Sequence, residues 1–239
     1  MENIAVIFAG GAGQRMNTRT KPKQFLELHG KPILIYTLEV FQRCEGINQI
    51  VLVMLADWIP YTIELLDKYR IRKVSAIVPG GNTGQESIFN GIKKAKEISK
   101  GNCGVLIHDG VRPIIDIETI NKCLKSLEQF GNAITVSPAI ETVALIGDEE
   151  SVGEILPRKK CVMAKAPQCF MINDIYNAHL KAQEERRDDF IDSASLMQHY
   201  GHKLHTVEGK PENLKITTPG DFYIFRAIID AQENSQIFG

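Results

Sequence analysis

Short β-branched runs alternate with amphipathic segments along most of this chain, and this alternation constrains its fold more than any other feature. Five apolar runs have the length and the Val and Ile content of strands, and they cover residues 4–8, 49–55, 74–78, 105–108 and 133–137. Four helical patterns lie between them, over residues 33–43, 59–69, 84–99 and 117–130. This order predicts a Rossmann-like α/β fold, with a mostly parallel sheet covered by helices on both faces.

The alternation breaks between residues 138 and 160, where two short apolar runs flank a Gly-Asp-Glu-Glu turn. This pattern predicts a protruding β-hairpin, and its apolar face is typical of a subunit contact. We therefore expect a dimerisation arm at 138–160, with a long surface loop as the alternative. Further helical patterns (173–185, 192–200, 219–232) and short strand patterns (203–207, 213–217) follow. They complete a single domain over residues 1–239.

The composition excludes several classes of protein. A formal net charge of −1 argues against a nucleic-acid binder, which would be clearly basic. No apolar run approaches the roughly 20 residues that span a bilayer, and no basic-then-apolar leader opens the chain. The five cysteines lie far apart without CxxC spacing, which favours reduced thiols over a thiolate metal site. We expect a cytoplasmic protein with no nucleic-acid or membrane partner.

A glycine loop follows the first predicted strand, at the sheet edge where ligands tend to bind. Glycines allow backbone N–H groups to approach phosphate oxygens closely. A dinucleotide loop is excluded, because Met16 stands at its third glycine and Pro22 interrupts the helix; the triphosphate P-loop pattern is absent from the sequence. Arg15 and Lys23 follow the loop and could hold a triphosphate, unless they are only solvated surface charges.

Four short motifs occur in a recognisable order. They read AGGAGQRM at 9–16 with PKQF at 22–25, HDGVRP at 108–113, APQCF at 166–170 and NLKIT at 213–217. In this order they resemble the signature of the polyol-phosphate cytidylyltransferase family. The resemblance covers nearly the whole chain and implies an enzyme that transfers a cytidylyl group from CTP.

The implied reaction joins CTP to a sugar-alcohol phosphate. A phosphate oxygen of the polyol phosphate attacks the α-phosphorus of CTP, and pyrophosphate leaves. The nucleophile needs no general base, because a phosphate monoester with a second pKa of about 6 is mostly ionised at pH 7. Catalysis is then expected to rest on positioning and on fixed positive charge.

The resemblance also implies site residues. Arg15, Lys23 and Lys215 would contact the phosphates and the transition state. Two glycine loops would bind the nucleotide through Ala9, Gly10, Gly11, Ala12, Gly13, Gly80, Gly81, Asn82 and Ser87. Asp109, after the fourth predicted strand, is a hard carboxylate suited to a Mg²⁺ cofactor. The structural alternatives are a strand-end lysine at 215, a helix cap in the second glycine loop and a turn cap at 109.

Three further residues would bind the polyol phosphate. Arg112 would grip its phosphate or support Asp109, and both interpretations stay open. Arg158, at the end of the arm, would reach the neighbouring subunit, so the resemblance implies a homodimer with shared sites. Asp192 resembles an aspartate that touches substrate hydroxyls, although Ile191 replaces the threonine that precedes it in the family.

Sequence details favour D-ribitol 5-phosphate as the substrate. They are the A-G-G start of the first loop, the V-R-P of the second motif and the pair Asp57-Trp58. The alternative is 2-C-methyl-D-erythritol 4-phosphate, used in isoprenoid synthesis. A non-catalytic nucleotide-binding module is a different class of alternative. A glycosyltransferase is disfavoured because the sequence contains no Asp-x-Asp motif.

Overall fold

The computed structural model describes residues 1–11 and 21–238, with the backbone alone for 235–238. Its centre is a seven-stranded sheet of order β11-β7-β10-β6-β1-β4-β5. The strands are β1 (Asn3–Ala9), β4 (Gln49–Met54), β5 (Val74–Pro79), β6 (Gly104–Asp109), β7 (Asn132–Pro138), β10 (Val162–Met171) and β11 (Thr206–Glu208). Only β10 runs antiparallel to its neighbours β6 and β7, so the predicted mostly parallel sheet is confirmed.

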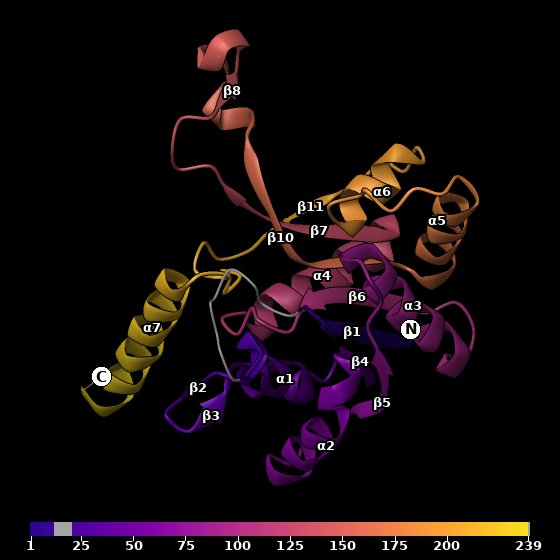
Figure 1. Ribbon diagram of the computed structural model, residues 1–239, viewed down its shortest axis with the longest axis vertical. Helices are drawn as coiled ribbons and strands as arrows, with labels where there is room; N and C mark the ends of the chain where they lie inside the picture. Colours follow the sequence, from indigo (N-terminus) through magenta and orange to yellow (C-terminus); the bar gives the residue numbers. More distant parts are fainter. Residues whose placement is uncertain (12–20, 239) are drawn as a thin grey trace.

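Helices cover both faces of this sheet (Figure 1). They are α1 (Ile33–Arg43), α2 (Ile59–Lys68), α3 (Gly84–Ile98), α4 (Ile117–Phe130), α5 (Ile172–Glu184), α6 (Ser193–His199) and α7 (Pro219–Phe238). Along β1, Ala5 and Ile7 face the core built with α1, α2 and α4, whereas Ile4 and Val6 face the core built with α3, α5 and α6. Successive strand side chains point to opposite faces, which is why a doubly covered strand is apolar throughout.

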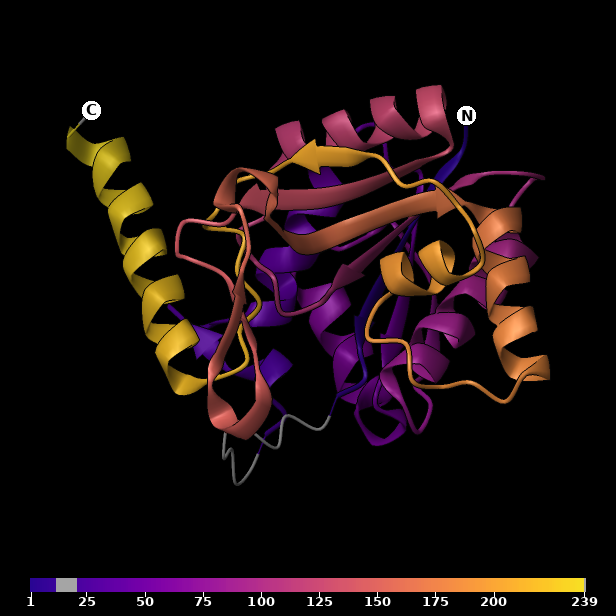
Figure 2. The same ribbon diagram turned by 90° about the horizontal axis from the view of Figure 1, so that it is seen from above.

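Local sequence signals set the ends of the helices that flank the site. The Thr83 side chain caps α3 by accepting from the Glu86 N–H, and Asp116 caps α4 by accepting from the Thr119 N–H at 2.7 Å. Gly131 ends α4 in the left-handed region with a φ of 76°. The last helix, α7, stands beside the sheet rather than on it (Figure 2).

The predicted hairpin at 138–160 is confirmed as an arm that protrudes from the domain (Figure 1). Its strands β8 (Ala144–Ile146) and β9 (Val152–Ile155) pair antiparallel, and the arm joins β7 to β10. Large apolar side chains along the arm and its base are exposed: Ile140, Leu145, Ile146, Val152, Ile155, Val162 and Met163. The arm therefore carries an apolar surface that its own domain does not cover.

The structure differs from the predicted strands in three places. The strand expected at 213–217 is wrong: this segment forms no ladder and instead hydrogen-bonds to the loop after β6, through Ile216 N–H and the Val111 carbonyl at 2.9 Å. The long strand β10 was missed, since Pro167 interrupts its pattern. The edge strand expected at 203–207 starts only at Thr206.

The remaining elements are short. A two-stranded hairpin joins β2 (Glu27–Leu28) to β3 (Lys31–Pro32). Single 3-10 turns are η2 (Lys23–Phe25), η3 (Ala56–Trp58), η4 (Asp148–Glu150) and η5 (Arg158–Lys160). In the described part of the chain, no helix combines the length and the apolar character needed to cross a bilayer.

The packing of α3 on the sheet gives a stability prediction. A Cβ at Gly91 would lie 2.5 Å from Val6 Cγ1 and 2.7 Å from Val53 Cγ2. Valine has little rotamer freedom to make room, so Gly91→Ala is expected to lower the free energy of unfolding by about 1–3 kcal/mol. Urea denaturation measures this change. Gly84→Ala is the control, because no described atom lies within 4 Å of its added Cβ; equal midpoints for the two variants would contradict the prediction.

Candidate functional site

A cleft of about 600 Å³ opens at the carboxyl ends of β1, β4 and β6. Segments far apart in the sequence meet there. Its lining is Phe8, Ala9, Gly10, Gly11, Lys23, Gln24, Leu55, Gly81, Asn82, Thr83, Gly84, Ser87, Asp109, Val111, Lys215 and Thr217. This is the sheet edge where parallel α/β folds bind ligands.

The two glycine loops pack against each other at the floor of this cleft. A Cβ on Gly10 would lie 3.5 Å from the Cα of Gly80, and one on Gly80 would lie 3.1 Å from Ser87 Oγ. Ser87 Oγ accepts from the Gly81 N–H at 3.0 Å and donates to the Thr83 carbonyl at 2.9 Å. The serine hydroxyl thus holds the second glycine loop in shape, and Thr83 supplies the helix cap.

Asp109 holds two cations that come from different parts of the chain. Its Oδ1 lies 2.5 Å from Lys215 Nζ, and its Oδ2 accepts from Arg112 Nε at 2.7 Å. Arg112 also donates from Nη1 to the Asn213 carbonyl at 3.1 Å. The aspartate side chain is only 7% exposed, whereas Lys215 is 39% exposed. The lysine therefore spans from a buried carboxylate to the open cleft.

Lys23 contacts the same segment one residue beyond Lys215. Its Nζ donates to the carbonyl of Ile216 at 3.0 Å, directly after Lys215 in the chain. Next to it, the buried Gln24 donates to the Ala9 carbonyl at 2.6 Å, which ties η2 to the end of β1. The lysine predicted to contact phosphates thus lies on the cleft with Lys215.

Opposing effects act on the ionisation of the buried groups. Burial by itself raises the pKa of Asp109, but the charges of Lys215 and Arg112 outweigh burial and lower that pKa below its ordinary value. Burial lowers the pKa of the neighbouring His108 to about 4, so its ring is neutral at pH 7. The histidine packs on Phe41, with ring centroids 5.0 Å apart, and has a structural role.

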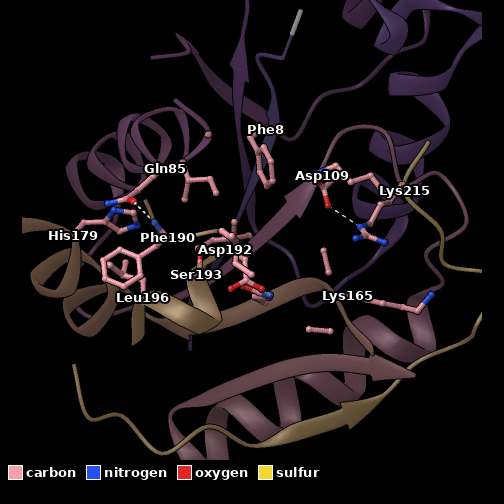
Figure 3. Close-up of a pocket in the computed structure, with 18 of the residues that line it drawn as sticks. Phe8, Gln85, Asp109, Lys165, His179, Phe190, Asp192, Ser193, Leu196 and Lys215 are labelled. Atoms are coloured by element: carbon pink, nitrogen blue, oxygen red, sulfur yellow. Dashed lines mark hydrogen bonds and ion pairs between the residues drawn. The ribbon is translucent and has the colours of Figure 1, made fainter. Parts of the chain in front are cut away.

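A second cavity of about 410 Å³ adjoins the cleft and shares Phe8, Gly84, Asp109 and Lys215 with it (Figure 3). Asp192 lies on its far side, where it caps α6 through Ser195 N–H and accepts from Gln168 Nε2 at 2.8 Å. Ile191, in place of the family's threonine, is 93% exposed. The site therefore has two compartments that meet at Asp109 and Lys215.

The side-chain amide of Gln85 ties one wall of the second cavity to α3. Gln85, the second residue of α3, donates to the Arg187 carbonyl at 2.9 Å and accepts from the Phe190 N–H at 3.2 Å. Figure 3 marks the contact between Gln85 and Phe190 with a dashed line. The loop that leads to Asp192 is thus held by the helix that follows the second glycine loop.

The chain is similar over nearly its full length to known cytidylyltransferases. The family described as 2-C-methyl-D-erythritol 4-phosphate cytidylyltransferase (IspD) matches residues 3–231. A ribitol-5-phosphate cytidylyltransferase of Vibrio parahaemolyticus is 51% identical over 237 residues, 99% of this chain and 100% of that protein. A 2-C-methyl-D-erythritol 4-phosphate cytidylyltransferase of Clostridium botulinum is 36% identical over 229 residues, 96% of this chain and 98% of that protein.

A solved structure agrees with the sequence relationship. The 4-diphosphocytidyl-2C-methyl-D-erythritol synthase of Anaerococcus prevotii superposes with a TM-score of 0.82 at 28% identity, covering 96% of each chain. The chain belongs to the IspD cytidylyltransferase family. It is a nucleotidyltransferase, as the resemblance of its four motifs implied.

Most of the residues expected in the cytidylyltransferase site do meet in space. The cleft contains Ala9, Gly10, Gly11, Lys23, Gly81, Asn82, Ser87, Asp109 and Lys215, and the second cavity adds Arg112 and Asp192. Gly80 packs directly behind the cleft. Ala12, Gly13 and Arg15 lie outside the described residues. Arg112 supports Asp109 and also lines the second cavity, and its contact with a substrate phosphate stays a prediction.

Arg158 is set apart from the residues that meet at the cleft. It lies in η5 at the base of the arm, and its Nη1 donates to the Ile140 carbonyl at 3.2 Å. Among the described residues it lines neither compartment of its own chain. Its expected role depends on a second subunit.

Sequence reasoning missed several lining residues of this cytidylyltransferase. Gln168 lies in the APQCF motif, so that motif could have identified it. Gln85 lies within the second glycine loop, which could have identified it, whereas Lys165 had no such signal because it stands just before the APQCF motif. Their roles come from contacts with segments at least 46 residues away in the chain.

Asp109 fits a magnesium ion only as one ligand among others. Both of its oxygens contact cations, and Arg112 and Lys215 would repel a bare divalent ion. Magnesium commonly binds through one or two protein carboxylates together with substrate phosphates. The residues present therefore fit a magnesium ion that arrives with the triphosphate.

The ion pairs of Asp109 predict a pH-dependent stability. Its lowered pKa means that its contribution is present above the ordinary value of about 3.9 and is lost as the pH falls through the lowered folded-state pKa. Asp109→Asn is therefore expected to reduce the free energy of unfolding by about 1.5–3 kcal/mol at pH 7. The difference from the wild type should shrink below about pH 3.9.

Urea unfolding at several pH values measures this difference. Asp67→Asn is the matched control, because Asp67 pairs with Arg72 at the surface, where the two side chains are 78% and 65% exposed. Exposed ion pairs of this kind contribute little to the free energy of unfolding. If Asp109→Asn were less stable than the wild type by the same amount at pH 7 and below about pH 3.9, the charge of Asp109 would not be the cause of the lost stability.

Proposed function

We propose that this cytidylyltransferase joins CTP and D-ribitol 5-phosphate to give CDP-ribitol and pyrophosphate. The observation that supports this most is the pair of adjoining compartments with Asp109 and Lys215 at their boundary. A nucleotide on one side and a polyol phosphate on the other would bring two anions together beside a lysine. The alternative substrate is 2-C-methyl-D-erythritol 4-phosphate.

In the proposed reaction, the glycine loops hold the cytidine and the triphosphate runs past Lys23. A phosphate oxygen of the polyol phosphate attacks the α-phosphorus of CTP. The bond from the α-phosphorus to the bridging oxygen breaks, and its electron pair leaves with pyrophosphate. No proton needs to move, because the attacking phosphate is already ionised. The main contribution of the protein is positive charge placed where negative charge gathers.

Lys215 is suited to provide that charge. Its ammonium is anchored by the buried Asp109, yet the side chain is 39% exposed toward the compartments. An ammonium held in place costs little reorganisation when the phosphates arrive. Arg15 is proposed to act from the first loop together with Lys23.

A Mg²⁺ ion is proposed to enter with CTP, with Asp109 as the protein carboxylate available to it. When bound, it would neutralise phosphate charge and orient the triphosphate. Lys23 and Lys215 would still contact the phosphate oxygens that the metal leaves exposed.

The preference for ribitol 5-phosphate rests on the relatives. Those named ribitol-5-phosphate cytidylyltransferase are 48–51% identical over at least 99% of this chain. The relatives named for 2-C-methyl-D-erythritol 4-phosphate are 36–38% identical. Asp192 is the residue proposed to contact the polyol hydroxyls.

The proposed enzyme is a homodimer with shared sites. The exposed apolar side chains of the arm, among them Ile146 at 87% and Val152 at 73%, are suited to a second subunit. Arg158 would then reach the polyol phosphate in the partner's second cavity. All five cysteines are free, which agrees with a reducing compartment such as the cytoplasm.

Pyrophosphate release tests the activity. The protein is mixed with CTP, Mg²⁺ and either ribitol 5-phosphate or 2-C-methyl-D-erythritol 4-phosphate, and efficient turnover is expected only with the first. Lys215→Ala should lower kcat about 10²–10³-fold, as for removal of one oxyanion donor. Lys125→Ala, an exposed lysine on α4, is the control. CTP binding without pyrophosphate release would favour the non-catalytic module instead.

Subunit mixing tests the shared site. Arg158→Ala and Lys215→Ala are each expected to be inactive, because each removes one cation from every site of the homodimer. Mixed dimers carry one site with both defects and one with neither, so activity should return to about a quarter of the wild type after random exchange. Lys159→Ala is the matched control for the arm. No recovery, with exchange demonstrated by mass spectrometry, would place Arg158 outside the partner's site.

A further inference from the structure

The register of β10 breaks where it passes the second cavity. Pairing with β7 runs through Ala164, is interrupted, and resumes at Gln168. Such irregularities re-aim side chains and are common beside active sites. Lys165 lies in this interruption and lines the second cavity with Asp109, Arg112 and Lys215 (Figure 3).

Lys165 grips the backbone that leads to Lys215. Its Nζ donates to the carbonyl of Pro211 at 2.9 Å and to the carbonyl of Asn213 at 3.2 Å. The Asn213 carbonyl also accepts from Arg112 at 3.1 Å, so one oxygen is held by two cations. This carbonyl lies two residues before Lys215 in the chain.

The same segment is fastened to β10 in the reverse direction. The buried Asn213 donates from Nδ2 to the Ala166 carbonyl at 2.7 Å. Lys165 and Asn213 therefore bind reciprocally across the gap between β10 and the segment 211–213. The segment forms no ladder with any described strand, so these side chains replace the strand pairing that would otherwise fix its position.

No carboxylate in the described part of the chain neutralises the positive charge of Lys165. Among the described residues, its ammonium contacts backbone carbonyls and pairs with no carboxylate. Burial, and then the neighbouring charge of Arg112, lower the pKa of Lys165. A half-buried lysine placed beside another cation costs stability, and that cost points to a role in the site.

We propose that Lys165 is a positioning residue that fixes the segment 211–213 and thereby sets where Lys215 meets Asp109 and the reacting phosphates. The catalytic part of this proposal rests on the proposed cytidylyltransferase activity. Lys165 itself acts through backbone carbonyls and not through substrate. Loss of its grip is expected to leave the substrates bound while Lys215 is misplaced, and misplacement by about 1 Å can cost about 10²-fold in rate.

Steady-state kinetics of Lys165→Met test the catalytic part. This variant keeps an unbranched apolar side chain but removes the donors, so kcat is expected to fall roughly 10–100-fold, with both KM values and the melting temperature nearly unchanged. Lys165→Arg, which restores donors to the carbonyls, should recover part of the rate. Lys210→Met is the control, because Lys210 lies in the same stretch but pairs with the exposed side of Asp116 at 3.0 Å.

Other kinetic results would overturn the proposal. A raised KM for the polyol phosphate at unchanged kcat would make Lys165 a substrate ligand. Equal kinetics for Lys165→Met, Lys210→Met and the wild type would show that its grip on the segment does not matter for Lys215. A rate loss that Lys165→Arg did not recover at all would also argue against positioning through the two carbonyls.

A second measurement does not require any enzymatic activity. The coupling between Asp109 and Lys215 is obtained from urea unfolding of Asp109→Asn, Lys215→Met and the double variant. The same cycle in the Lys165→Met background is expected to give a smaller coupling, since Lys215 would no longer be held at the carboxylate. An unchanged coupling would refute the positioning role. A smaller coupling in a protein that releases no pyrophosphate would retain that role and reject the proposed function.

Discussion

The site depends on a buried carboxylate at the end of β6 that holds cations from two other places in the chain. Asp109 is the point where the parallel sheet, the loop containing Arg112 and the segment containing Lys215 are joined. Its ionised form is stable despite burial because the two cations lower its pKa. Together with the hydrogen bonds of Lys23 and Lys165, these contacts hold the segment 211–217 across the carboxyl edge of the sheet.

This arrangement suits a reaction between two anions. The cleft at this edge of the sheet is lined by two lysines, one from η2 and one from the segment before α7. Each lysine is already fastened, Lys23 to a carbonyl and Lys215 to a carboxylate. Fixed charge of this kind is more effective than mobile charge, because little rearrangement accompanies the reaction.

The regular part of the fold could be predicted because its signals are local. The apolar runs of β1, β4 and β6, the periodicity of α3 and α4, and the Asp116 cap are all readable over a few residues. The errors occur where long-range contacts override local pattern. Pro167 masked β10, and the strand-like residues 213–217 bind a loop and side chains instead of a strand edge.

The sequence by itself determined the fold class and the cytidylyltransferase family, and it named many of the residues that line the cleft, because glycine loops, apolar periodicity and ordered motifs are encoded over short stretches. Only the tertiary structure decided that Asp109 binds Lys215, that Arg112 and Lys165 share the Asn213 carbonyl, and that Arg158 stands on the arm away from its own cleft. Those contacts join residues up to 106 positions apart, counted from 109 to 215. Their geometry follows from how the sheet, the loops and the arm pack, which no short pattern specifies.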